Sequence, residues 1–314
     1  MPEKKIAVLI PALDEELTIA KVVKDFKKEL PKAEIYVFDN GSTDRTSERA
    51  RQAGAKVKLY KKKGKSEVMK EMFDSVDVDI YIMVDADDTY PANEVHKLIK
   101  PVAEDEADMV IGSRLKNFQK EEKRWLHNIG NNLINRSVNF CFNTKINDIE
   151  SGYRAMNREL IKNTTILSRG FGIEPEITIK ALENHFRIKE IPIGYKERPK
   201  GSKSKLNSFS DGMYILQTIL NLFRDYRPMQ FFLMLSAIFF AITIGFAVPV
   251  LHELFTTGKI TKIYTFSMTL ISFMISFTLF IAGFITSAVH SLRQEMTVMM
   301  NRLRKDIERL GKNK

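Results

Sequence analysis

The chain has 314 residues, of which 44% are hydrophobic and 28% are charged, so it can bury a core and is not disordered as a whole. A single cysteine excludes a disulfide framework, and five histidines leave little scope for a zinc site built from histidine. The formal net charge of +10 indicates an anionic partner. Because no nucleic-acid-binding motif accompanies that charge, nucleic acid is excluded and anionic lipid headgroups are favoured. Residues 1–16 turn acidic after a short apolar stretch, which predicts no secretory signal peptide.

Short apolar runs alternate with amphipathic segments through the first 112 residues. The apolar runs have the length of strands, and the segments between them carry apolar residues at helical spacing. This alternation predicts an α/β fold in which a mostly parallel sheet is covered by helices on both faces. The expected strands span residues 6–10, 34–38, 57–60, 80–84 and 109–112, and the expected helices span residues 14–30, 43–53, 66–75 and 91–103.

The pattern loosens beyond residue 112. Further helices are expected at residues 123–142 and 174–184, and a strand is expected at residues 188–195. Residues 196–206 are rich in Lys, Gly and Ser, which predicts a mobile loop. An amphipathic helix then leads into the apolar tail, and it lies either along a membrane interface or in an ordinary core. Its apolar face is formed by Met213, Leu216, Leu220 and Phe223.

Two uncharged runs, residues 229–251 and 264–289, are each long enough for a bilayer core, which needs about 20 apolar residues. The alternative is a pair of buried core helices, but neither run shows the polar face that such helices usually have. Lys and Arg are more frequent on the outer flanks than in the turn between the runs, so the positive-inside rule places the N-terminal part and the tail in the cytoplasm. The sequence therefore predicts a first domain at residues 1–206, a juxtamembrane helix at 207–228, a membrane hairpin at 229–289 and a basic tail at 290–314.

Acidic and small residues gather directly after three of the expected strands. In a parallel sheet these strand ends form one edge, which is where such folds bind ligands. Carboxylates brought together there repel one another unless a cation or a donor-rich ligand lies between them, and oxygen ligands suit Mg²⁺ or Mn²⁺ bound with a diphosphate. The three groups are Pro11, Ala12, Asp14 and Glu15; Asp39, Asn40 and Gly41; and Asp85, Ala86, Asp87 and Asp88.

These groups resemble the three nucleotide-sugar motifs of glycosyltransferase family 2. They read Pro-Ala-Leu-Asp-Glu-Glu from Pro11, Asp-Asn-Gly-Ser-Thr-Asp from Asp39 and Asp-Ala-Asp from Asp85. Three further segments resemble the branch of the family that glycosylates polyisoprenyl phosphates, which includes dolichol-phosphate mannose synthase and the bactoprenol-phosphate glucosyltransferases. They span residues 112–114, 148–154 and 198–206, and the whole resemblance covers roughly residues 5–228.

The resemblance implies a GT-A fold, a nucleotide-diphosphate sugar donor, a polyprenyl phosphate acceptor in the lipid bilayer, a divalent metal and inversion at the anomeric carbon. It also implies roles for residues, by position. Asp39 would contact the nucleoside, and the base and ribose pocket would be lined by Pro11, Ala12 and Glu15. Gly41 and Ala86 belong to the same binding motifs. Asp85 and Asp87 would hold the metal on the diphosphate, and Arg114 would face the phosphates. Asp148 would lie near the sugar. Arg198 and Lys205 would neutralise phosphate.

Some of these residues permit a plainer interpretation. The mannose synthase pattern continues with Leu-Gln after the acid pair, whereas Asp88 and Thr89 stand in this chain, so the glutamine that would help the metal is absent. Asp88 is also a candidate turn residue. Gly152 and Arg154 are compatible with a simple turn and an ordinary salt bridge.

Residues 61–66 superficially look like a phosphate-binding P-loop, but Leu59 stands where that motif requires glycine. The three-lysine run at residues 61–63 is therefore expected on a solvated face. Small residues in the second apolar run could pack the protomers of a homo-oligomer. These residues are Ala282, Gly283 and Ser287.

Two other functions stay open at this point. One is a processive polysaccharide synthase, although such enzymes usually carry Gln-x-x-Arg-Trp and more membrane helices, and Glu121 stands in place of that glutamine. The other is a membrane scaffold built on an inactive transferase, against which the intact carboxylates argue. Nucleotide binding in the presence of Mn²⁺ is the observation that discriminates an active site from such a scaffold.

Overall fold

The computed structural model describes residues 4–60, 62, 64–114, 125–164, 173–196, 198, 217, 220–221 and 223–312. The chain divides into two compact units, Met1–Ile215 and Leu216–Lys314, which are taken one at a time. Lys205 lies outside the described residues, as do most of the expected loop at 196–206 and the greater part of the expected amphipathic helix. The predicted boundary after residue 206 therefore stays a prediction.

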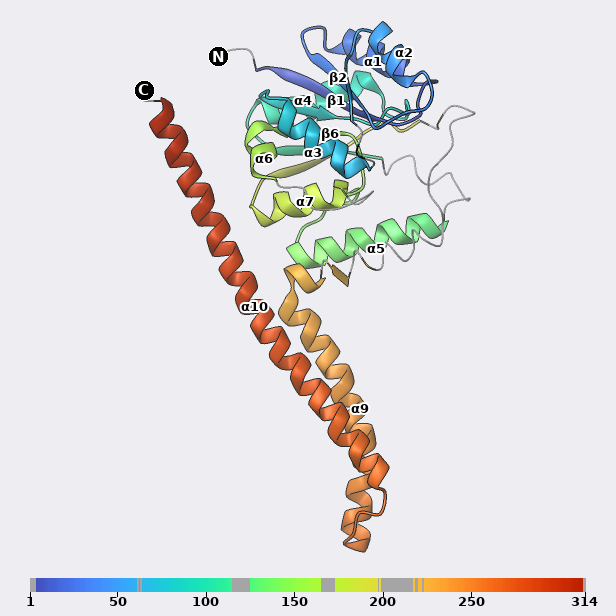
Figure 1. Ribbon diagram of the computed structural model, residues 1–314, viewed down its shortest axis with the longest axis vertical. Helices are drawn as coiled ribbons and strands as arrows, with labels where there is room; N and C mark the ends of the chain where they lie inside the picture. The colour runs from blue at the N-terminus through green and yellow to red at the C-terminus, as the bar shows by residue number, and fades with distance from the viewer. Residues whose placement is uncertain are drawn as a thin grey trace. The chain divides into compact units, whose positions relative to one another are not determined.

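Unit 1 is built on a seven-stranded sheet with the strand order β3-β2-β1-β4-β6-β5-β7 (Figure 1). Neighbouring strands run parallel except at β6, which is antiparallel to both β4 and β5. The mostly parallel sheet expected from the sequence is thus confirmed. The strands are β1 (Ile6–Ala12), β2 (Glu34–Asp39), β3 (Lys56–Leu59), β4 (Ile80–Met83), β5 (Met109–Ser113), β6 (Arg154–Asn157) and β7 (Ile188–Pro192).

Strand β6 has no counterpart among the strands expected from the sequence. It has four residues, of which only Ala155 and Met156 are apolar, and this is too short a pattern to show a period. Its first residue, Arg154, is the register partner of Met83, the last residue of β4. The antiparallel insertion therefore brings the loop before β6 alongside the acidic motif that follows β4.

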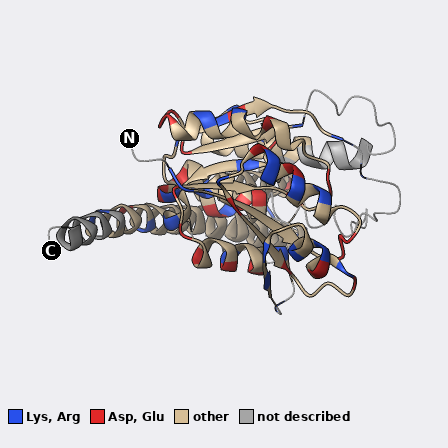
Figure 2. Ribbon diagram, turned by 90° about the horizontal axis from the view of Figure 1, so that it is seen from above, with Lys and Arg blue, Asp and Glu red and all other residues tan. Residues whose placement is uncertain are grey.

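Helices cover both faces of this sheet (Figure 1). On one face Val8 of β1 belongs to the same core cluster as Val23 and Leu98 from two helices. On the other face Tyr81 of β4 makes an edge-on ring contact with Phe73, with 6.4 Å between ring centres. Basic and acidic residues are interspersed along these helices (Figure 2). The helices are α1 (Ile19–Glu29), α2 (Thr46–Gln52), α3 (Lys65–Ser75), η1 (Ala92–Glu94), α4 (Val95–Ala103), α5 (Trp125–Phe142), α6 (Arg158–Asn163) and α7 (Ile173–Glu183).

Unit 2 contains two helices that are long and apolar enough to cross a membrane, Pro228–Thr257 and Ile263–Met300. The first is α9 (Pro228–Thr257), and it ends at Gly258, whose φ of +70° closes the helix. The second belongs to α10 (Ile263–Lys312), which is a single helix of 50 residues. The segment predicted as a separate tail from residue 290 therefore continues the second apolar helix as far as Lys312.

Small and hydroxyl residues hold α9 against α10. The hydroxyl of Ser236 donates to the carbonyl of Ser276, and the hydroxyl of Ser276 donates to the carbonyl of Ser236, both at 2.9 Å. A Cβ on Gly283 would lie 2.9 Å from the Cβ of Phe232, so this glycine lets the two helices approach closely. Gly283, expected between protomers, thus makes a contact inside the chain, and the homo-oligomer stays a prediction.

Candidate functional site

The loops after β1, β2 and β4 begin side by side at the carboxyl edge, which is the edge formed by the carboxyl ends of the parallel strands. Ala12 is the register partner of Asp39, and the Asn40 N–H donates to the Ala12 carbonyl at 2.9 Å. On the other side of β1, the Val84 N–H donates to the Leu9 carbonyl at 3.2 Å. The convergence expected of the three acidic motifs is therefore present in the structure.

Asp39, expected at the nucleoside, is only 2% exposed. Its Oδ1 accepts a hydrogen bond from the Ser42 N–H at 2.7 Å, and its Oδ2 accepts one from the Ser47 hydroxyl of α2. Next to it, Gly41 has a φ of +83°, and no atom of the described residues lies within 4 Å of the position that a Cβ would take. The backbone conformation favours glycine there, and a Cβ at this position would meet none of the described residues other than its chain neighbours.

The loop after β1 is tied to the loop after β2 by hydrogen bonds. The carboxylate of Asp14, a residue with a φ of +50°, accepts from the Thr43 N–H at 2.7 Å. The Glu15 N–H donates to the Thr46 hydroxyl at 2.8 Å. These bonds hold the chain out of a helix, which is why α1 begins later than the sequence predicts. Pro11 at the end of β1 is partly exposed beside this loop.

Asn40 fixes the start of helix α3. Its Oδ1 accepts from the Gly64 N–H at 2.9 Å, and its Nδ2 donates to the Lys62 carbonyl at 2.6 Å. Gly64 has a φ of +121°, which glycine adopts far more readily than other residues, and its turn places Lys65 at the first position of α3. Lys65, one of the P-loop-like residues 61–66 that were given no ligand from the sequence, thereby enters the carboxyl edge.

Lys65 bridges two carboxylates. Its Nζ lies 2.9 Å from Oδ1 of Asp85 and 2.5 Å from Oε1 of Glu174, which stands in the first turn of α7. Burial opposes the charged form of both partners, but the pairing outweighs it, so the pKa of Lys65 is raised and the pKa of Asp85 is lowered. Sequence reasoning set Lys65 aside with the P-loop-like residues 61–66 and did not mark Glu174, and only the folded chain brings the two together.

The carboxylate of Asp85 is packed directly on Gly152. A Cβ at residue 152 would lie 2.3 Å from Oδ2 of Asp85, so any larger residue would displace that carboxylate. The Gly152 N–H also donates to the hydroxyl of Tyr90 at 3.0 Å. Gly152 is therefore required by the close approach of an acidic side chain, and not only by a turn.

Asp87 is held by an arginine from a distant part of unit 1. Its Oδ2 lies 2.6 Å from Nη2 of Arg198, and its Oδ1 accepts from the Thr89 hydroxyl at 2.6 Å. Asp88 has a φ of +59° and pairs with Lys21 at 2.8 Å. Thr89 is therefore a hydrogen-bond donor to Asp87. Asp88 is a turn residue whose carboxylate pairs with Lys21.

Arg114 and Asp148 form a two-pronged ion pair. The guanidinium Nε and Nη2 of Arg114 lie 2.9 and 2.8 Å from the two oxygens of Asp148, and the Arg114 N–H adds a third bond at 2.9 Å. The guanidinium also lies over the ring of Tyr195, at 5.6 Å from its centre. The Asp148 N–H donates to Glu190 at 2.8 Å. Both predicted residues therefore belong to one hydrogen-bonded group.

Arg154 is fully buried and does not form the ordinary salt bridge considered from the sequence. It donates to the carbonyl of Ser151 at 2.8 Å, to the hydroxyl of Thr178 at 2.8 Å, and to the carbonyl of Ile149. Burial lowers its pKa to about 10, so the guanidinium keeps its charge at neutral pH. Its role is to hold the loop that carries Asp148.

Glu150 lies in that same loop, and its carboxyl group has a raised pKa. Burial, with smaller contributions from Glu174 and Asp148, raises its pKa to about 7, although the charge of Arg114 acts in the opposite direction. The residue is therefore partly protonated at neutral pH. Local sequence patterns do not indicate this raised pKa, because it depends on burial.

Asp85 and Asp87 are the residues that could hold a divalent ion. No group of three or more His, Cys, Asp and Glu side chains within the described residues could hold a metal by itself. Two carboxylates suit Mg²⁺ or Mn²⁺ when a diphosphate and water supply the other oxygens, which is the way these ions are commonly held. The donor set therefore fits such an ion bound together with a diphosphate.

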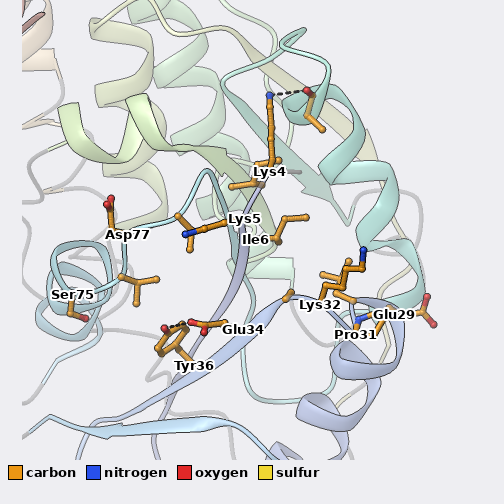
Figure 3. Close-up of a pocket in the computed structure, with 16 residues that line it drawn as sticks. Lys4, Lys5, Ile6, Glu29, Pro31, Lys32, Glu34, Tyr36, Ser75 and Asp77 are labelled. Atoms are coloured by element: carbon orange, nitrogen blue, oxygen red, sulfur yellow. Dashed lines mark hydrogen bonds between the residues drawn. The ribbon is translucent and has the colours of Figure 1, made fainter. Parts of the chain in front are cut away.

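A separate groove of about 860 Å³ lies at the opposite end of the sheet, beside the amino ends of β1, β2 and β4 (Figure 3). Lys4 on its wall pairs with Asp105 at 3.1 Å, and the hydroxyl of Tyr36 donates to Glu34. Since parallel α/β sheets bind ligands at the carboxyl ends of their strands, this groove is not part of the candidate site.

The sequence is similar to those of known glycosyltransferases. The sequence model of glycosyl transferase family 2 matches residues 7–165. The glycosyltransferase AglJ of Haloferax volcanii is 33% identical over 249 residues, which cover 79% of this chain and 82% of that protein. A dolichyl-phosphate hexose transferase of the same organism is 29% identical, over 71% of this chain and 95% of its own.

A solved structure shows the same fold. Glucosyl-3-phosphoglycerate synthase from Mycobacterium tuberculosis, crystallised with Mn²⁺ and UDP-glucose, matches with a TM-score of 0.55 and 23% identity. The match covers 70% of this chain and 78% of that chain. The GT-A-like fold expected for the catalytic part is thereby confirmed.

Proposed function

The chain belongs to glycosyltransferase family 2, and on that basis we propose that it transfers a hexose from a UDP- or GDP-linked sugar to a polyprenyl phosphate in a membrane. One observation carries the proposal. A single chain joins an acid pair, Asp85 and Asp87, at the carboxyl edge to two helices that are apolar enough for a bilayer. The similarity to a dolichyl-phosphate hexose transferase supports the same class of acceptor.

We assign the nucleoside to the hydrogen-bonded side of the carboxyl edge, around Asp39 and Gly41. Space beside Gly41 is open, and Pro11, Ala12 and Glu15 stand at the neighbouring strand end. We assign the diphosphate to the other side, where Asp85 and Asp87 would hold Mg²⁺ or Mn²⁺. When bound, such an ion neutralises charge on the leaving diphosphate.

The transfer is a displacement with inversion. An oxygen of the lipid phosphate forms a bond to the anomeric carbon while the bond from that carbon to the donor diphosphate breaks. The second pKa of a phosphate monoester is about 6, so this oxygen is already unprotonated at neutral pH and needs no strong general base. What the protein must supply is positive charge. Arg114, Arg198 and Lys205 are the candidates, and Asp148, held by Arg114, positions the sugar.

The membrane assignment follows from the same reasoning. A polyprenyl phosphate carries its reactive group at the membrane surface, so an enzyme anchored by α9 and α10 meets it there. The charge flanking these helices favours a cytoplasmic location for both the catalytic unit and the C-terminus. Protease protection in oriented vesicles tests this topology.

A transfer assay tests the function. Full-length protein in lipid nanodiscs is incubated with a panel of radiolabelled UDP- and GDP-sugars, Mn²⁺ and a polyprenyl phosphate, and the organic phase is counted. We expect label in a product that mild acid releases as a single hexose. Long polymers instead would indicate a polysaccharide synthase. Nucleotide binding without any transfer would overturn the proposal in favour of a non-catalytic binding protein.

A further inference from the structure

Each of the two proposed metal ligands is already paired with a cationic side chain of unit 1. Oδ1 of Asp85 lies 2.9 Å from Nζ of Lys65, and Oδ2 of Asp87 lies 2.6 Å from Nη2 of Arg198. An ion that binds both carboxylates must take its place beside two positive charges. Metal binding therefore competes with these pairs.

The charges of the site show what relieves that competition. Three carboxylates, those of Asp85, Asp87 and Glu174, face the two cations Lys65 and Arg198, which leaves one net negative charge. A divalent ion alone reverses that balance, and a diphosphate alone makes it more negative. The diphosphate of a nucleotide sugar carries two negative charges, so ion and diphosphate together leave the net charge unchanged.

Building on the proposed function, we propose that Lys65 and Arg198 act as stand-ins for the divalent cation. They neutralise Asp85 and Asp87 when no donor is bound, and they transfer to phosphate oxygens when the ion and the nucleoside diphosphate bind together. The ion alone consequently binds weakly, and each of the two ligands strengthens the binding of the other.

Lys65 and Arg198 differ in how readily each can move away from its aspartate. The side chain of Arg198 is 36% exposed, so it can swing away from Asp87 into solvent or toward a phosphate. The side chain of Lys65 is 21% exposed, and its second partner, Glu174, is 7% exposed, so Lys65 stays compensated when it releases Asp85. Arg198 is therefore the residue whose removal should change metal binding most cleanly.

The test measures Mn²⁺ binding to the full chain in detergent, from the EPR signal of the free ion, with and without saturating UDP or GDP. In the wild type we expect one of the nucleotides to tighten Mn²⁺ binding by at least about tenfold. Arg198→Gln should bind Mn²⁺ alone at least about threefold more tightly than the wild type and show a smaller effect of nucleotide. Arg198→Met, which also lacks the charge, should behave in the same way.

A matched control is Arg187→Gln, which breaks a 3.0 Å pair with Asp108 away from the carboxyl edge and should leave both values unchanged. A protein-free titration with the same nucleotide corrects for Mn²⁺ bound by free nucleotide. Equal Mn²⁺ affinity with and without both nucleotides in the wild type would overturn the proposal. So would an Arg198→Gln variant that binds Mn²⁺ alone no more tightly than the wild type.

These outcomes are independent of the acceptor, because no lipid enters the measurement. A chain that shows the coupling but transfers nothing to polyprenyl phosphate would refute the proposed function and leave the stand-in role intact. A chain that glycosylates the lipid without the coupling would do the reverse.

Discussion

The two sides of the carboxyl edge hold their polar side chains by different means. On the nucleoside side, Asp39 and Asn40 are tied to backbone groups and hydroxyls of the neighbouring loops. On the diphosphate side, Asp85, Asp87 and Asp148 are each paired with a cationic side chain. On the first side the fold itself supplies the hydrogen-bond partners. On the second side each carboxylate is paired with a cation, and another cation, such as a metal ion, could take that cation's place.

The nucleoside side is the preformed part of the site. Hydrogen bonds from backbone amides and hydroxyls satisfy the polar side-chain atoms of Asp39 and Asn40 within the protein, so the nucleoside side is held in place without a ligand. Buried carboxylates are costly without a partner, and the protein supplies its own cations where a metal would otherwise be needed. We therefore expect changes on the diphosphate side to have the larger effects.

The largest effect is expected for Lys65→Met. The substitution leaves the buried Glu174 and the partly exposed Asp85 beside each other without their common cation, and we expect it to cost up to about 3–5 kcal/mol of stability, the loss typical of a broken buried pair. Chemical unfolding of the full chain in detergent measures it. Lys189→Met breaks a pair with Glu106 in which both side chains are about half exposed, and it should cost less than about 1 kcal/mol. Similar losses for the two variants would contradict the comparison.

The next effect is on turnover. Asp87→Asn removes a charged ligand from the proposed metal site, and we expect turnover to fall by at least about 10²-fold, or about 2.7 kcal/mol of transition-state stabilisation. The initial rate of sugar transfer at saturating Mn²⁺ checks this. Asp88→Asn changes a neighbouring carboxylate that pairs with Lys21 instead, and its rate should stay within a few-fold of the wild type. Full activity of the wild type in EDTA would sink the metal assignment.

The sequence predicted one side of this comparison better than the other. Asp39, Asp85 and Asp87 were identified because each follows an apolar run with the length of a strand, and parallel strands bring such positions together. Lys65 and Glu174 lie at the starts of two helices far apart in the chain, and nothing local marks them as partners. Their meeting depends on tertiary packing, which local patterns do not contain.

The fold shows the same limit. Long periodic segments were predicted at nearly their observed positions, whereas β6 is a four-residue strand whose pairing is decided by its neighbours. The continuation of α10 through residue 290 was also not predicted, because the change from apolar to basic composition suggested a boundary. That change alters the surroundings of a helix without ending it, since neither Gly nor Pro occurs between Gly283 and Gly311.

A smaller change at Gly152 should perturb the diphosphate side by shape alone. In Gly152→Ala the new Cβ would lie 2.3 Å from Oδ2 of Asp85, so that carboxylate must move away from its present position. We expect a stability loss of about 1–3 kcal/mol and weaker Mn²⁺ binding in the presence of nucleotide. Gly245→Ala is the matched control, because a Cβ there would lie within 4 Å of no described residue beyond its own chain neighbours and the adjacent turns of its helix. Unchanged Mn²⁺ binding in Gly152→Ala would show that Asp85 does not need this contact.

The smallest effect is expected from Glu150, and it depends on pH. Burial raises the pKa of this carboxyl from 4.5 to about 7 in the folded chain, so the folded state holds its proton over a range in which the unfolded chain has lost it. The contribution of Glu150 to the free energy of unfolding is therefore fully present below about pH 4.5, and it is lost as the pH rises through about 7. Glu150→Gln cannot lose a proton. It should match the wild type near pH 4.5 and be more stable above pH 7, by about 1–2 kcal/mol once partial exposure is taken into account. Apparent melting temperatures measured from pH 5 to pH 8 should diverge in that direction, and parallel curves would show that Glu150 ionises in the folded protein as it does in water.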